Sequence, residues 1–97
     1  MTVLVQPRFD TEIFSETKYQ EPPKYAVILY NDNQHHMEEV INILMEILSF
    51  PKERATKHTL EAHHTGRSIL FVTHYERAEF YHLRLKGRTL ITDLEKM

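Results

Sequence analysis

The sequence predicts a small α+β protein with a single domain, in which a three-stranded antiparallel sheet packs on helices in the order β-α-α-β-α-β. The chain has 97 residues, which leaves room for only one domain. Short runs of β-forming residues at 25–30, 68–73 and 90–94 alternate with segments whose apolar residues recur at helical spacing. The composition, with 41% hydrophobic and 27% charged residues, is typical of globular proteins.

The first strand and the first helix are separated by a polar corner. Residues 25–30 are β-forming and stop at Asn31-Asp32-Asn33. Beyond the corner, apolar residues recur every three or four positions and predict a helix with one buried stripe, formed by Met37, Val40, Ile41, Leu44, Ile47 and Leu48. Asp32 or Asn33 is expected to cap this helix, because short polar side chains accept hydrogen bonds from its first N–H groups.

Proline and glycine mark the second helix, which is predicted to run from Lys52 to Gly66. Pro51 suits the position where a helix begins, and Gly66 suits the left-handed position where one ends. The helix is poor in apolar residues, and its candidates for burial are Ala55, Thr59, Leu60 and Ala62. The strand that follows, 68–73, is bulky enough to be buried on both faces.

The third helix is predicted between this strand and the last one. Thr73 and Glu76 have the spacing of a capping box at its start, and Gly87 is expected to end it. The face predicted to be buried carries Ala78, Tyr81, His82 and Leu85. Residues 90–94 supply the third strand.

Residues 1–23 differ from the rest of the chain, because their apolar residues follow neither a helical nor a strand period. Pro22-Pro23 closes the segment, since two prolines lack backbone donors and prefer an extended conformation. The sequence therefore predicts a flexible N-terminal extension over residues 1–23 and a core domain over residues 24–97. A second interpretation is that aromatic residues of the extension engage a partner.

Charge and composition exclude several classes of function. The net charge of −2 argues against a broad electrostatic contact with nucleic acid or with an anionic membrane. No apolar run approaches the ~20 residues that span a bilayer, and the N-terminus lacks the basic and apolar regions of an export signal. The chain contains no cysteine, so we expect a cytoplasmic location and no thiolate chemistry.

Enzymatic function is not expected either. The two glycines cannot form a glycine-rich phosphate loop, so no nucleotide cofactor is predicted. No serine lies in a recognisable nucleophile motif, and no catalytic residue is assigned. The seven histidines form adjacent pairs at 35–36 and 63–64 but no pair spaced to share one helical face. We predict no metal site, although a histidine-based metal-binding protein remains an alternative.

The polar corner is the part of the sequence most suggestive of a site. Asn31, Asp32 and Asn33 place one carboxylate and two amides where a strand ends. Such residues favour turns and caps in any case. They also suit a cation with several donors, such as a primary ammonium group, with His63 supplying a neutral imidazole if the first two helices pack side by side.

Three ordered motifs resemble the bacterial ClpS adaptors. The first is Pro22-Pro23-Lys24-Tyr25-Ala26-Val27-Ile28-Leu29-Tyr30-Asn31-Asp32-Asn33, followed by Met37-Glu38. The second runs from Arg54-Ala55-Thr56 to Ala62-His63-His64-Thr65-Gly66-Arg67-Ser68. The third is a strand, a helix that starts near Glu76, and a last strand that ends at Leu94-Glu95. Together they cover residues 22–97 in the order of the family.

The resemblance implies a non-enzymatic adaptor. Such proteins bind substrates whose N-terminal residue is Leu, Phe, Tyr or Trp and deliver them to a Clp AAA+ unfoldase, ClpA or ClpC, with its ClpP peptidase. The resemblance also implies no cofactor, and the sequence shows nothing typical of an obligate interface, so we expect a monomer. Residues 1–22 correspond to an extension that family members feed toward the unfoldase pore.

The resemblance assigns roles residue by residue. The positions that bind the N-terminal amine match Asn31, Asp32 and His63. The hydrophobic pocket matches Met37, Val40, Ile43, Thr59, Ala62 and Leu90. Asn33 and His35 lie near the site without an assigned role, and Glu76 matches an unfoldase contact.

Some positions depart from the family pattern. Asn33 replaces a second aspartate, Thr59 and Ala62 replace larger apolar residues, and Tyr81 replaces a residue that is often basic. One alternative is a ClpS-like modulator that binds the unfoldase without presenting substrates. Another is a relative of the C-terminal domain of the ribosomal stalk protein, which shares the fold but lacks the Asn-Asp corner and the later histidine.

Overall fold

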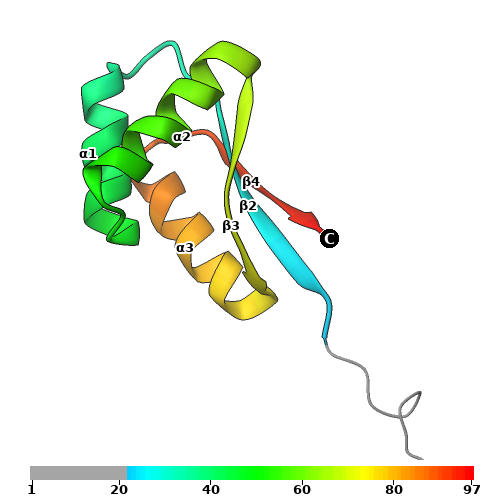
Figure 1. The fold of residues 1–97 in the computed structure, drawn as a ribbon. Coiled ribbons are helices and arrows are strands. Elements are labelled where there is room, and N and C mark those ends of the chain that lie inside the picture. The colour runs from blue at the N-terminus through cyan, green and yellow to red at the C-terminus, as the bar shows by residue number, and fades with distance from the viewer. Residues whose placement is uncertain (1–21) are drawn as a thin grey trace, which may run out of the picture.

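A computed structural model describes residues 22–97, and its elements follow the predicted order (Figure 1). They are β2 (Lys24–Tyr30), α1 (Met37–Leu48), α2 (Lys52–Thr65), β3 (Arg67–His74), α3 (Tyr75–Gly87) and β4 (Thr92–Lys96). The predicted α+β class is confirmed. Most of the predicted N-terminal extension, residues 1–21, lies outside the described residues, so the division of the chain at residue 23 stays a prediction.

The sheet has the order β3-β2-β4, with β2 antiparallel to both neighbours. Leu29 pairs with Ser68 on one side and with Thr92 on the other. The last strand begins at Thr92, so its predicted start at residue 90 was wrong. Leu90 is still part of the turn after α3, where its N–H donates to the carbonyl oxygen of Leu85 at 3.3 Å.

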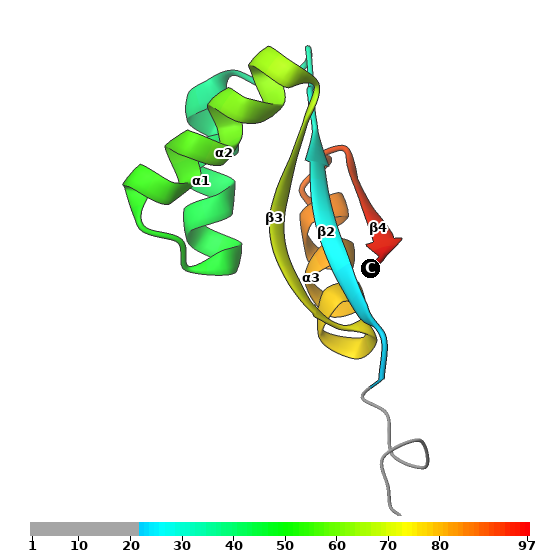
Figure 2. The same cartoon turned by 45° about the vertical axis from the view of Figure 1, so that its right-hand side comes forward.

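All three helices lie to one side of the sheet, as Figures 1 and 2 show from two directions. Their apolar faces meet the inner face of the sheet in one core, whose most buried members include Val27, Leu29, Leu44, Leu70 and Leu85. Helix α2 buries only Ala55, Thr59 and Ala62, which are small enough to let its backbone approach its neighbours. The expected burial of Leu60 was wrong, because this side chain is 39% exposed.

Burial of β3 on both faces was also a wrong prediction. Ser68 and Leu70 face the helices and are buried, whereas Ile69 and Val72 are each 42% exposed. The cause is topological, since β3 is an edge strand and the helices cover only the inner face of the sheet.

The starts of two helices differ from the prediction. The residue before α1 is His36, neither Asp32 nor Asn33, and its N–H donates to the Glu39 carboxylate at 3.1 Å. The residue before α3 is His74, because Thr73 still belongs to β3 and pairs with Tyr25. As a result, residues 31–36 form a loop whose polar side chains are free for other contacts.

The predicted end of α2 is confirmed. Gly66 has a φ of 97°, and its N–H donates to the carbonyl oxygen of Ala62 at 2.9 Å. Within residues 22–97, no helix has the length and apolar character needed to cross a membrane.

Candidate functional site

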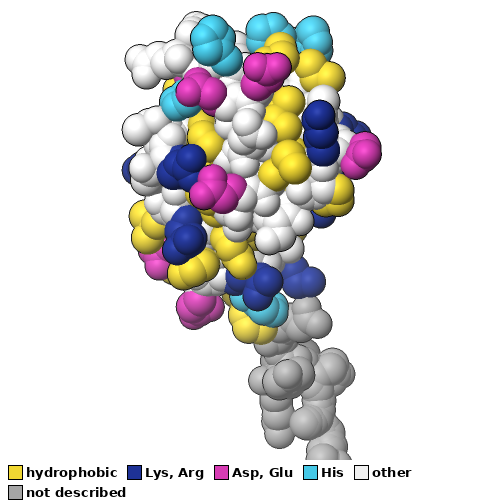
Figure 3. Space-filling view, turned by 90° about the vertical axis from the view of Figure 1, so that its left-hand side faces the viewer, with side chains coloured by type: hydrophobic (Ala, Val, Ile, Leu, Met, Phe, Trp, Pro, Cys, Tyr) yellow, Lys and Arg dark blue, Asp and Glu magenta, His cyan; other side chains and the backbone are white. Residues whose placement is uncertain are grey.

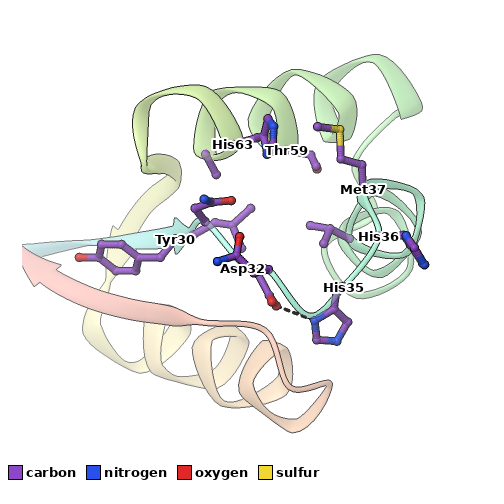
Figure 4. A pocket seen from close by; sticks show the side chains of 12 residues that line it. Tyr30, Asp32, His35, His36, Met37, Thr59 and His63 are labelled. Atoms are coloured by element: carbon purple, nitrogen blue, oxygen red, sulfur yellow. Dashed lines mark hydrogen bonds and ion pairs between the residues drawn. The ribbon is translucent and has the colours of Figure 1, made fainter.

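A cavity of about 260 Å³ opens where the end of β2, the 31–36 loop, the start of α1 and the last turns of α2 meet (Figure 4). The loop contributes polar side chains, and the two helices contribute an apolar floor. The lining residues are Leu29, Tyr30, Asn31, Asp32, Asn33, His35, His36, Met37, Val40, Thr59, Ala62 and His63. Residues as far apart in the chain as Leu29 and His63 are thereby brought to one place.

The cavity gathers most of the residues singled out from the sequence. Those that line it are Asn31, Asp32, Asn33, His35, Met37, Val40, Thr59, Ala62 and His63. Two predicted pocket residues are not among the lining residues. Ile43 and Leu90 are 6% and 3% exposed and belong to the hydrophobic core. Ile43 lies almost one turn beyond Val40, deeper in the packing of α1.

Three lining residues had been missed in the sequence, namely Leu29, Tyr30 and His36. These residues could have been predicted from their positions next to Asn31 and Met37. The last residues of a strand that ends at a site lie close to that site. Glu76, the predicted unfoldase contact, lies away from the cavity in the exposed first turn of α3.

Backbone hydrogen bonds hold the corner at the end of β2. The N–H of Tyr30 donates to the carbonyl oxygen of Ile91 at 2.9 Å, and the N–H of Asn31 donates to that of Gly66 at 3.0 Å. The second bond ties the corner to the end of α2, the helix that carries His63. The positions of Asn31 and His63 on the same cavity therefore depend on the turn at Gly66.

The carboxylate of Asp32 is held on both oxygens. Its Oδ1 accepts from the backbone N–H of Gln34 at 2.6 Å, and its Oδ2 lies 2.5 Å from Nδ1 of His35. Burial of the carboxyl group raises its pKa, but the hydrogen bonds from Gln34 and His35 outweigh that effect and lower the pKa below the usual value of 3.8. Asp32 is therefore ionised at neutral pH, and its side chain is only 5% exposed.

The floor of the cavity is formed by Val40, Thr59 and Ala62, which are at most 6% exposed. The hydroxyl group of Thr59 donates to the carbonyl oxygen of Ala55 at 2.8 Å, so its polar atom is satisfied within α2. Met37, half-buried at the start of α1, lies at the edge of this floor (Figure 4). The floor is thus suited to an apolar side chain.

Histidine side chains gather over the upper end of the face shown in Figure 3. His63 and His64 are both exposed, and their rings meet edge to face with centroids 5.2 Å apart. Within the part of the chain that the structure describes, no three His, Asp or Glu side chains are grouped so that they could hold a metal ion.

A polar network that had not been predicted supports α2 from the side of β3. Ser68 donates to Glu61 at 2.6 Å, His58 Nδ1 lies 2.8 Å from the Ser68 hydroxyl, and Arg54 Nε donates to His58 Nε2. Burial and the nearby Arg54 lower the pKa of His58. Because Nε2 accepts from Arg54, the single proton of neutral His58 resides on Nδ1 and points at Ser68.

Fold and site together define a small α+β binding protein. The cavity combines one ionised carboxylate and the polar groups of neighbouring amides and an imidazole with an apolar floor. Such a site suits a ligand that has several N–H donors next to an apolar group. Ser68, which is only 2% exposed, lies outside the cavity.

Comparison with known proteins agrees with this class. A family model described as ATP-dependent Clp protease adaptor protein ClpS matches residues 20–90. The chain is 35% identical over 80 residues to an ATP-dependent Clp protease adapter protein ClpS of Synechococcus elongatus, covering 81% of this chain and 84% of that one. It is 44% identical over 59 residues to a ClpS of Campylobacter jejuni, covering 61% of this chain and 62% of that one.

Among solved structures, the fold is similar to that of Agrobacterium tumefaciens ClpS2 bound to L-phenylalaninamide. The TM-score is 0.72 at 22% identity, and the match covers 79% of this chain and 100% of that chain. The chain belongs to the ClpS family, whose members are adaptor proteins of the ATP-dependent Clp protease.

Proposed function

We propose that this adaptor binds substrate proteins through a free N-terminal amine and a large hydrophobic first side chain (Leu, Phe, Tyr or Trp), and delivers them to a Clp AAA+ unfoldase, ClpA or ClpC. The observation that carries the proposal is the composition of the cavity. Asn31 and Asp32 from the corner after β2 and His63 from α2 line it together with an apolar floor.

A protonated α-amine offers three N–H donors and one positive charge. The ionised carboxylate of Asp32 supplies the opposite charge, and hydrogen bonds between charged partners are about twice as strong as neutral ones. The side-chain oxygen of Asn31 and a neutral imidazole at His63 are the two further acceptors. Capture of an N-terminal amine is a recurrent mode of peptide recognition.

The apolar floor explains why the first side chain of the substrate has to be large and hydrophobic. Burying a Leu or Phe side chain contributes roughly 1.5–3 kcal/mol, and Val40, Thr59 and Ala62 offer it a closely packed surface. The small Ala62 leaves room above α2. The ligand named for the Agrobacterium tumefaciens structure, L-phenylalaninamide, has a free amine next to a phenyl ring, which is the combination proposed here.

The proposed unfoldase contact lies at the other end of the molecule. Glu76 shares one exposed face of α3 with Phe80 and Leu83, which are 53% and 56% exposed. Helix α3 starts after His74, which pairs with Lys24, whereas the cavity lies beyond Tyr30. The length of β2 separates these ends by roughly 20 Å, so a single chain can hold substrate and unfoldase at once.

Fluorescence anisotropy with a labelled peptide that begins with Phe tests the proposal. We expect micromolar or tighter binding, no binding of the N-acetylated peptide, and loss of binding in Asp32→Ala while the domain stays folded. Acetylation removes the charge and leaves buried acceptors unpaired. Undiminished affinity of Asp32→Ala would contradict the proposal.

If no peptide binds but the unfoldase binds and Glu76→Ala abolishes that contact, the protein is instead a modulator of the unfoldase.

A further inference from the structure

The side chain of His35 connects Asp32 to the loop between α3 and β4. Its Nδ1 lies 2.5 Å from Oδ2 of Asp32, and its Nε2 lies 2.9 Å from the hydroxyl oxygen of Thr89. The His35 side chain is 15% exposed, and Figure 4 shows its ring next to the Asp32 carboxylate. The resemblance to the ClpS adaptors assigns no role to this residue.

The hydrogen-bond partner of Nδ1 shows that this nitrogen of His35 carries a proton. A carboxylate can only accept hydrogen bonds, so Nδ1 of His35 carries the proton and donates it to Asp32. The Thr89 hydroxyl lies near two acceptors, Nε2 of His35 at 2.9 Å and the carbonyl oxygen of Arg88 at 2.5 Å. Its single proton is donated to Nε2 of a neutral imidazole, whereas beside a charged imidazole the hydroxyl accepts from Nε2 and donates to Arg88. The chain Thr89–His35–Asp32 is therefore complete in either protonation state of His35.

Thr89 itself has an unusual backbone conformation. Its φ is 65°, in the left-handed region that β-branched residues rarely adopt. The loop is held by the N–H of Thr89, which donates to the carbonyl oxygen of Lys86 at 2.8 Å, and by a 2.9 Å ion pair between Arg88 and Glu46 of α1. A strained residue persists where surrounding contacts hold it, and here it directs a hydroxyl group at His35.

We infer that His35 is a positioning residue, anchored by Thr89, that holds the Asp32 carboxylate in one orientation for the amine of the ligand. This inference rests on the proposed function. Each oxygen of the held carboxylate has used one of its acceptor sites and keeps another. The ligand then meets a carboxylate whose rotamer is already ordered, which lowers the entropy cost of binding.

The inference predicts coupled effects of substitution. Thr89→Val removes the hydroxyl group at nearly constant shape, and we expect it to weaken binding of the free-amine peptide roughly five- to tenfold, as for one lost hydrogen bond. His35→Ala should weaken binding at least as much. The double variant should be no weaker than His35→Ala, because both substitutions break one chain of contacts. Thr89→Ser, which keeps the hydroxyl group, should restore the affinity.

Thr73→Val is the matched control. Thr73 lies in β3 next to the pair of Lys24 and His74, at the end of the sheet away from the cavity, so its replacement should leave peptide affinity unchanged. Imidazole ¹⁵N NMR of the unsubstituted protein should show Nδ1 of His35 protonated, and the signal should change in Asp32→Asn.

The outcomes separate the two proposals. If the unsubstituted protein binds no free-amine peptide, the proposed function fails, and with it the ligand role of His35. If it binds but Thr89→Val and His35→Ala have no effect, or have effects that add, only the positioning role is overturned. An Nδ1 without a proton would also overturn it.

Discussion

The N–H of Asn31 donates a 3.0 Å hydrogen bond to the carbonyl oxygen of Gly66, and this bond joins the end of β2 to the end of α2. Thirty-five positions separate the two residues in the chain. The contact exists because Gly66 takes up a left-handed conformation, with φ at 97°, and turns the backbone back toward the corner. One wall of the cavity is thereby placed against the other.

Replacement of Gly66 tests this role. Gly66→Ala should lower the free energy of unfolding by about 1 kcal/mol or more, because alanine is strained at positive φ. No atom lies within 4 Å of an added Cβ, so backbone strain is the only cost. Urea unfolding measures the change. Gly87→Ala is the matched control, since Gly87 is a helical residue with equally open surroundings and should be neutral or stabilising.

A larger side chain at Ala62 would fill the space above the floor of the cavity and leave Asn31, Asp32 and His63 unchanged. Ala62→Leu should weaken binding of a peptide that begins with Phe by at least tenfold, because the added side chain occupies the space above α2. Overpacking is expected to cost about 1–3 kcal/mol of stability, which thermal unfolding would measure. Leu60→Ala, an exposed position on the same helix, should leave peptide affinity unchanged. Full affinity in Ala62→Leu would show that the peptide does not enter this cavity.

Stability should fall as the solution is acidified below about pH 6.5. Burial lowers the pKa values of both His58 and His82 in the folded protein from the usual 6.5. The unfolded chain therefore takes up protons first, and the stabilisation is fully present above pH 6.5 and is lost as the pH falls through the folded pKa values. The lowered pKa of Asp32 affects stability only at a pH below the usual carboxyl pKa of 3.8. Urea unfolding between pH 8 and pH 5 measures the slope.

His58→Gln should flatten that slope, because glutamine does not titrate. His82→Gln should flatten it independently, since His82 contacts Thr92 of β4 rather than the His58 network. A slope that is the same in both variants and in the unsubstituted protein would contradict the assignment.

The exposed face of α3 should govern the contact with the unfoldase and leave substrate binding alone. Glu76→Lys reverses a charge in the first turn of α3 and should weaken binding to the proposed unfoldase, ClpA or ClpC, at least tenfold in a pull-down or titration. Anisotropy with the free-amine peptide should be unchanged, because the cavity lies beyond the opposite end of β2. Equal loss of both activities would indicate a folding defect instead.

Local signals in the sequence were sufficient for the elements and for the corner of the site. Helical periodicity located α1, the β-forming run at 25–30 located β2, and Gly66 marked the end of α2. Each of these signals acts between residues a few positions apart, which is why it can be read along the chain. The polar triplet that begins at Asn31 was recognised for the same reason, since it interrupts the strand.

Long-range packing decided which residues line the cavity and which face of β3 is covered. Val40 lines the cavity while Ile43, three residues later, belongs to the core, and only the packing of α1 against its neighbours distinguishes them. β3 is open on one face because of its place at the edge of the sheet.

The contact between His35 and Thr89 spans 54 positions and carries no local signature, because it arises where the turn after α3 folds back beside β2. The sequence by itself thus indicated most, though not all, of the groups that line the cavity. The tertiary structure decided which of them meet, since hydrogen-bond geometry depends on positions that distant segments take only when packed together.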